Sequence, residues 1–175
     1  MPTSRVFTFD MPYLPQRAYL DTSFVLRVLR EEAIPRHEKR KRHNVSYFER
    51  LRAGGSDLWT SPLGLEETVW QLIKPVLSEF GQVRERIERG LAGLERLGVD
   101  VRIPPAALTR HREQWLAGVK SLVLDYEIQP ADALHLIFAQ LGNSDGIVSN
   151  DAGFQRAVKG LEEGSLAVYA QNLAP

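Results

Sequence analysis

Short apolar segments alternate with longer amphipathic ones along this chain of 175 residues. The short segments predict buried strands, at residues 18–20, 58–60, 146–148 and 166–169. Because buried strands that alternate with helices pack into a parallel sheet covered on both faces, the pattern indicates an α/β fold. The share of helix is expected to be large.

The longer segments repeat apolar residues at helical spacing. Thr22 and Ser23 are N-cap candidates for a first helix that Pro35 stops, and Gly54 ends a second helix around Tyr47. Further helices are predicted at about residues 63–80, 83–97, 107–126, from Pro130 with a buried stripe of Leu134, Ile137, Phe138 and Leu141, and at 151–158. Residues 101–103 form either a strand or a linker.

The first 17 residues have a different character, with prolines at positions 2, 12 and 15. Proline lacks a backbone N–H and fixes φ, so this segment is predicted to be an irregular N-terminal extension. Residues 18–175 are then expected to form a single domain, which their number allows.

Charge and cysteine content narrow the function. Twenty-two basic residues balance twenty-two acidic ones, which excludes binding to a polyanion by net charge alone. The absence of cysteine excludes disulfides, thiolate catalysis and cysteine zinc sites. No apolar run approaches the roughly 20 residues of a membrane span, and the N-terminus lacks a signal-peptide core. A cytoplasmic protein without membrane contact is expected.

One local excess of positive charge stands out in this neutral chain. Residues 36–43 carry five Lys or Arg against one Glu, and Arg40 and Arg42 are candidate substrate-binding residues. The run is either a phosphate-contacting patch or a solvated loop. Tyr47 and Phe48, which follow it, either stack on unpaired bases or belong to the core, and the core is the favoured interpretation.

Four carboxylates occupy a particular place in the pattern. Asp21 and Asp151 follow predicted strands, and Glu67 and Asp132 lie in the first turns of predicted helices. Since ligands of open α/β sheets bind beyond the carboxyl ends of the strands, these side chains are expected to converge. Taken singly, Asp132 and Asp151 are also natural helix caps. Glu67 is preferred to its neighbour Glu66, which falls nearer the apolar arc of its helix.

Convergent carboxylates repel one another and stay ionised only beside compensating positive charge. Hard divalent cations prefer carboxylate oxygen, so Mg²⁺ or Mn²⁺ fits this set best. Such ions promote phosphodiester hydrolysis, which makes a nuclease the expected function. His135 lies one helical turn after Asp132 and is interpreted as a packing partner rather than a ligand.

The segments that hold the four carboxylates also resemble a known family. They are residues 19–26, 61–70, 130–136 and 147–154, and in this order and spacing they resemble PIN-domain proteins, in particular the toxin-type, VapC-like ribonucleases. The family pattern matches Asp21, Glu67, Asp132 and Asp151 as catalytic and metal-binding residues. The resemblance implies that Ser149 supports the site by hydrogen bonding. Ser149 is therefore counted among the candidate substrate-binding residues, with Arg40 and Arg42.

This resemblance implies a three-layer α/β/α sandwich around a mostly parallel sheet and Mg²⁺- or Mn²⁺-dependent cleavage of RNA. For a toxin-type member it also implies a small antitoxin partner and a homodimer. A stand-alone RNA-processing nuclease and a non-catalytic RNA- or protein-binding module are the alternatives. A metal-dependent phosphatase is disfavoured because Thr22 and Ser23 follow Asp21, where an Asp-x-Asp pair is usual.

Overall fold

A single sheet of six parallel strands forms the centre of the computed structural model, which describes residues 6–32, 34–35, 37–38, 42–77, 80–158 and 166–170. The strands are β1 (Val6–Thr8), β2 (Arg17–Leu20), β3 (Asp57–Thr60), β4 (Asp100–Val101), β5 (Gly146–Val148) and β6 (Ala167–Ala170), in the order β1-β6-β5-β2-β3-β4. All pairs are parallel. The predicted α/β fold is confirmed.

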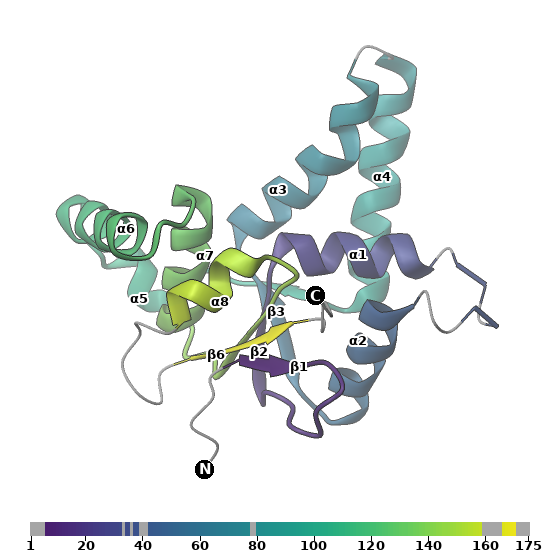
Figure 1. The fold of residues 1–175 in the computed structure, drawn as a ribbon. Helices are drawn as coiled ribbons and strands as arrows, with labels where there is room; N and C mark the ends of the chain where they lie inside the picture. The colour runs from purple at the N-terminus through teal and green to yellow at the C-terminus, as the bar shows by residue number, and fades with distance from the viewer. Residues whose placement is uncertain are drawn as a thin grey trace.

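Helices cover both faces of this sheet (Figure 1). They are α1 (Thr22–Glu32), α2 (His43–Ala53), α3 (Pro62–Ile73), the 3₁₀ turn η2 (Lys74–Val76), α4 (Phe80–Leu97), α5 (Pro105–Leu108), α6 (Arg112–Tyr126), α7 (Pro130–Leu141) and α8 (Ala152–Val158). Alternate strand residues face opposite layers: Ala18 and Leu20 pack with α1 and α2, and Tyr19 packs with α7 and α8. The arrangement is a three-layer α/β/α sandwich.

The sheet brings the ends of three strands together. β2 lies between β5 and β3, and Leu20 pairs with Val148 in the parallel register. The residues that follow these strands therefore emerge at the same edge, with Asp21 after β2, Ser149 after β5 and Ser61 after β3. A crevice at this kind of edge is where open α/β sheets place their ligands.

Three helix predictions are wrong in detail. The helix predicted at 63–80 ends at Ile73, because Pro75 cannot donate the next backbone hydrogen bond, and α4 begins three residues early at Phe80. The helix predicted at 107–126 is two helices. His111 and Gln114 form a capping box that starts α6 separately from α5.

The buried face of α7 also differs from the predicted stripe. Ala133, Leu136 and Ile137 are buried, whereas Leu134 and Phe138 are only half-buried. The predicted buried face is therefore rotated by about one residue around the helix axis from the observed one. Apolar residues extend beyond both sides of the buried face, so their positions alone do not locate its centre. His135 falls on the buried side as a result.

The N-terminal segment is not irregular throughout. Val6–Thr8 forms the edge strand β1 beside β6, so the prediction is wrong for these residues. The guanidinium of Arg50 donates hydrogen bonds to the carbonyl oxygens of Phe9 and Met11, which ties the segment to α2. Phe9 stacks on the Tyr47 ring with centroids 4.1 Å apart. β4 likewise settles the open choice at 101–103, with Val101 in a strand.

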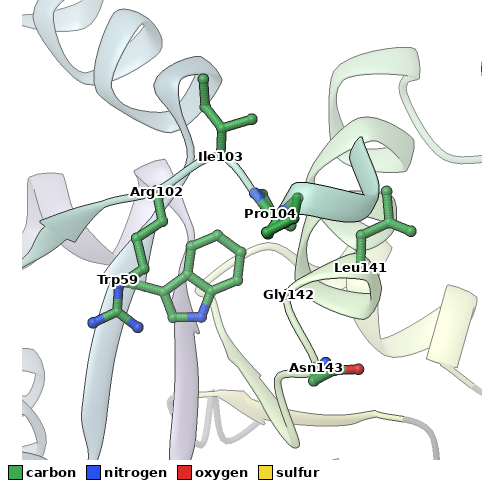
Figure 2. Close-up of a pocket in the computed structure, with 8 residues that line it drawn as sticks. Trp59, Arg102, Ile103, Pro104, Leu141, Gly142 and Asn143 are labelled. Carbon is green, nitrogen blue, oxygen red and sulfur yellow. The ribbon is translucent and has the colours of Figure 1, made fainter. Parts of the chain in front are cut away.

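A surface hollow lies beside β3, towards the β4 end of the strand order (Figure 2). Its volume is about 420 Å³, and Trp59, Arg102, Leu141 and Gly142 are among its lining residues. The Trp59 side chain is buried, and its Nε1 donates a hydrogen bond to Ser144 Oγ at 2.9 Å. None of the four predicted carboxylates lines this hollow.

Among the described residues, no helix combines the length and apolar character that a membrane crossing needs.

Candidate metal-dependent active site

Asp21 directly follows β2, at the edge of the sheet where the strands end, and is almost completely buried, with 4% of its surface exposed. Its Oδ2 accepts hydrogen bonds from Ser23 N at 3.1 Å, Ser23 Oγ at 2.5 Å and Ser149 Oγ at 2.8 Å. The contact with Ser23 N is a capping interaction, so Asp21 caps α1 in place of the predicted Thr22 or Ser23. Three donors to one oxygen fix the orientation of the carboxylate, and the other oxygen, Oδ1, lies 3.9 Å from His135 Nε2.

Ser149 connects this carboxylate to the loop after β5. Its hydroxyl donates to Asp21 and accepts a hydrogen bond from Asp151 N at 2.9 Å. Asn150 N donates in turn to Ser23 Oγ at 3.0 Å. Ser149 is completely buried, so its hydroxyl orients Asp21 and the backbone of Asp151 from behind.

Glu67 approaches Asp21 from α3, about one and a half turns after the helix start. The Ser61 side chain caps this helix by accepting a hydrogen bond from Gly64 N. Oε2 of Glu67 lies 2.8 Å from Thr22 Oγ1 and 2.8 Å from His135 Nε2. The hydrogen bond from His135 holds the pKa of the Glu67 carboxyl below its ordinary value, so Glu67 is ionised at neutral pH.

His135 is the buried partner in this pair, with 1% of its surface exposed. Its Nδ1 lies 2.6 Å from the hydroxyl of Tyr19, which lies 2.7 Å from Ser61 Oγ. Burial opposes protonation of the imidazole, but the hydrogen bond to Glu67 and the charge of Asp21 outweigh it and raise the pKa of His135. The interpretation of His135 as a hydrogen-bonded packing partner agrees with these contacts.

Asp132 and Asp151 complete the acidic group. Burial, and then the charges of Asp151 and Asp21, raise the pKa of the Asp132 carboxyl from 3.8 to about 6. Asp151 is exposed, and its Oδ1 accepts a hydrogen bond from Gly153 N at 2.6 Å. A Cβ at Gly153 would lie 3.0 Å from Asp151 Oδ1 and 3.7 Å from Asp132 Oδ2, so glycine leaves room between the two carboxylates.

The four predicted carboxylates therefore lie within electrostatic reach of one another. Asp132 feels the charge of each of the others, and only His135 opposes them. Among the described residues, no three His, Asp or Glu side chains stand close enough to hold a metal ion as they are.

The donor set nevertheless fits a hard divalent cation. All four groups offer carboxylate oxygen, and the pKa of Asp132 is raised first by burial and then by the negative charges of the other carboxylates. Among the described residues, the hydrogen bonds to the Asp21 side chain go to Oδ2, and the one to the Asp151 side chain comes from the backbone N–H of Gly153. A cation there would relieve the repulsion that now favours a proton on Asp132.

Glu66 does not share this environment. Its side chain is exposed, while Gly64 and Thr68 form the buried face of α3. The expectation that Glu66 would lie nearer the core is therefore wrong, although Glu67 is the residue that lies beside Thr22 and His135. The apolar arc drawn through Leu65 and Val69 misled because both are only half-buried.

The predicted basic patch is only partly within the described residues. Residues 36 and 39–41, with Arg40 among them, lie outside them. Arg42 Nε donates a hydrogen bond to the carbonyl oxygen of Glu31 at 3.3 Å, where α2 begins. Tyr47 and Phe48 are buried in the core, which excludes the alternative that they stack on bases.

Sequence reasoning missed the residues that orient the carboxylates. Tyr19 contacts His135, which is 116 residues away along the chain, and Ser61 contacts Tyr19 from 42 residues away. Both residues therefore act on Glu67 through His135. No spacing signal links such distant residues. Thr22 and Ser23 directly follow Asp21. Their sequence position predicts helix caps, whereas in the structure the Thr22 hydroxyl donates to Glu67 and the Ser23 hydroxyl donates to Asp21.

Comparison with known proteins adds one match. The model of a protein family described as PIN domain matches residues 18–160, a range that includes all four carboxylates, His135 and Ser149. No curated protein matches the sequence.

Proposed function

We propose that this chain, which belongs to the PIN domain family, is a metal-dependent ribonuclease that hydrolyses phosphodiester bonds at the carboxylate group around Asp21. Proteins with this domain are typically nucleases that use divalent metal ions and act on RNA. The observation that carries the proposal for this chain is the convergence of the four carboxylates. Ser149 links Asp21 to the backbone of Asp151, a Cβ at Gly153 would lie within 4 Å of both Asp151 and Asp132, and His135 Nε2 lies 2.8 Å from Glu67 and 3.9 Å from Asp21. The pKa of Asp132, raised first by burial and then by nearby carboxylates, agrees with this arrangement. The acidic side chains repel one another here, and a bound cation would offset this repulsion.

In this proposal Asp21, Glu67, Asp132 and Asp151 hold Mg²⁺ or Mn²⁺. When bound, the ion supplies positive charge for the phosphate and lowers the pKa of a water molecule. Ser149 and Ser23 keep Asp21 in one orientation through hydrogen bonds to Oδ2. Such supporting contacts fix the direction in which a ligand offers its other oxygen.

His135 and Thr22 play the same orienting part for Glu67. Both contact Oε2, so the carboxylate is anchored by one oxygen and Oε1 remains for the site. Tyr19 fixes the imidazole through Nδ1. Asp132 must lose its proton before it can act as a ligand, and binding of the cation drives that loss.

The test compares RNA cleavage by neighbouring variants. Glu67→Gln is expected to lower the rate of single-stranded RNA cleavage in Mn²⁺ by about a hundredfold or more, because amide oxygen carries no charge to hold the ion. Glu66→Gln, which removes an exposed charge one residue away, should cleave at the wild-type rate. Cleavage is measured on a labelled RNA with Mn²⁺, Mg²⁺ or EDTA. Undiminished cleavage in EDTA, or equal loss in both variants, would contradict the proposal.

A second prediction concerns pH. The pKa of Asp132 is about 6 in the folded protein against 3.8 ordinarily, so the folded state keeps a proton that the unfolded chain releases between these values. Stability without metal should fall as pH rises through this window. The raised pKa of His135 extends the loss above pH 6.5, because its stabilising contribution fades as the imidazole deprotonates.

Metal binding should show the opposite trend with pH. Below about pH 6 the proton on Asp132 competes with the cation, and each pH unit should weaken apparent affinity by about tenfold. Thermal stabilisation by 1–5 mM Mn²⁺, roughly saturating for such sites, should therefore be larger at pH 7 than at pH 5. Asp132→Asn should flatten this difference. Equal stabilisation at both pH values in the wild type would remove Asp132 from the ligand set.

The biological role is a finer proposal. We propose the toxin of a toxin–antitoxin pair, on the resemblance of the four motif segments to VapC-like ribonucleases, with a stand-alone RNA-processing nuclease as the alternative. The antitoxin, the homodimer and the cytoplasmic location stay predictions. So does the division into an N-terminal extension and a domain from residue 18, although β1 makes the extension part of the sheet.

A further inference from the structure

A hollow of about 420 Å³ lies away from the carboxylates, between the second half of α1 and the hairpin of α3 and α4. The hairpin stands above α1 in Figure 1. Leu29 and Leu72 form part of the lining, together with Gly90 and Gly93 of α4. A Cβ at Gly90 would come within 2.4 Å of Leu72, and one at Gly93 within 2.7 Å of Leu29, so the two glycines let the three helices meet closely.

Positive charge surrounds this hollow. Four arginines and one glutamate line it: Arg30, Arg86, Arg89, Arg96 and Glu32. The glutamate pairs with Arg96 at 2.5 Å, and Arg89 pairs with Glu85 on the exposed side of α4. Within the part of the chain that the structure describes, neither Arg30 nor Arg86 has a carboxylate partner. The hollow thus keeps a net positive charge in a chain whose formal charge is zero.

The hollow lies along α1 and α3. Helix α1 directly follows Asp21, and α3 carries Glu67. Thr22, at the beginning of α1, contacts Glu67 of α3. Arg30 is eight residues further along α1 and Leu72 five residues further along α3, which corresponds to about 12 Å and 8 Å at the helical rise. A ligand that passes over the carboxylates can therefore reach the hollow.

The chemistry favours a phosphate ligand. Four carboxylates repel an RNA backbone, so in the absence of a bound metal ion affinity for RNA has to come from positive charge elsewhere on the surface. The planar guanidinium donates paired hydrogen bonds that match phosphate oxygens. Two unpaired arginines from different helices that line one hollow present such donors from two sides.

We propose that this arginine-lined hollow binds the phosphodiester backbone of the RNA substrate at a distance from the scissile bond. The proposal rests on the proposed function, because it takes RNA as the substrate. Arg30 and Arg86 are the residues that contact phosphate, and Arg89 and Arg96 add long-range attraction. Leu29 and Leu72 supply apolar surface to the lining.

The test removes the two unpaired arginines together. Arg30→Gln with Arg86→Gln is expected to weaken binding of a labelled single-stranded RNA in EDTA by about tenfold or more at low salt. Each lost phosphate contact on a single strand should lower the slope of log affinity against log salt by about 0.7. The double variant should therefore lose about 1.4 from this slope, and its KM in Mn²⁺ should rise.

Two further variants make the outcome specific. Arg84→Gln removes the same charge from the outer side of α4, where Arg84 pairs with Glu88, and should leave RNA affinity and slope unchanged. Arg30→Lys with Arg86→Lys should restore most of the slope but less of the affinity, because lysine keeps the charge and loses the fork. Equal losses in Arg84→Gln and the double glutamine variant would overturn the proposal.

The same experiment separates this inference from the proposed function. If wild-type protein cleaves RNA and the double glutamine variant binds RNA with unchanged affinity and slope, the hollow is not an RNA site and the nuclease proposal stands. If poly-glutamate binds wild type but not the double variant while RNA binding is unaffected, the hollow receives an acidic polypeptide instead. If the wild type neither binds nor cleaves RNA, both proposals fail together.

Discussion

Replacing Asp21 with asparagine is expected to abolish metal-dependent RNA cleavage, with a loss of about a thousandfold or more in kcat/KM. Residues that only orient a metal ligand typically contribute 10- to 100-fold, so loss of a ligand charge at the centre of the site should cost more. Asparagine can keep the hydrogen bonds from Ser23 and Ser149 through its amide oxygen. The NH₂ group then occupies the place of Oδ1 and cannot hold a cation.

The same substitution should leave the fold intact. It removes one of the carboxylates that repel Asp132, so the melting temperature without metal should be unchanged or higher than that of the wild type. Stabilisation by Mn²⁺ should disappear. Asp125→Asn is the matched control, because Asp125 is an exposed carboxylate on α6 that contacts only Ser121 among the hydrogen bonds described. Cleavage at the wild-type rate by Asp21→Asn would end the proposal of a nuclease site at these carboxylates.

Replacing Gly142 with alanine is expected to destabilise the protein by about 3 kcal/mol, at the upper end of the usual cost of overpacking a core. A Cβ at this position would lie 2.2 Å from Cζ2 and 2.5 Å from Cη2 of Trp59 (Figure 2). The indole cannot move aside easily, since it is 2% exposed, stacks edge-on against Tyr19 and donates its N–H to Ser144. Backbone strain is not the cause, because φ of Gly142 is −83°.

A glycine in open space provides the comparison. Gly81 lies near the start of α4, and a Cβ there would meet no atom within 4 Å. Gly81→Ala should leave stability unchanged or raise it by up to about 1 kcal/mol, because alanine restricts the unfolded chain and favours helix. Urea unfolding of both variants measures the difference in midpoint. A midpoint for Gly142→Ala equal to that of the wild type would mean that the Trp59 ring is not held as described.

Apolar periodicity was sufficient to predict the layers of this fold. Strands with apolar residues on both faces, such as β2 and β5, have to be covered by helices on both sides, so their alternation with helices indicates the sandwich before any coordinate is known. Helix ends were harder to predict. Pro75 and the His111 capping box each break a segment that periodicity alone extends, because local backbone hydrogen bonds decide where a helix stops.

The edge strand β1 shows a further limit of pattern reasoning. Val6–Thr8 is too short and too close to prolines to be recognised as a strand by itself. It forms because β6 offers a free edge, with Val6 paired to Val168 across a distance of 162 positions. Only the completed sheet provides that partner.

The sequence by itself determined the α/β class, the order of most elements and the positions of the acidic residues after strands and at helix starts. Tertiary structure decided which atoms meet: that His135 holds Glu67, that Ser149 holds Asp21 and that Arg30 and Arg86 line one hollow. The physical reason is range. Periodicity and capping are properties of neighbours along the chain, whereas charge and hydrogen bonding act between any groups that folding brings within a few ångströms.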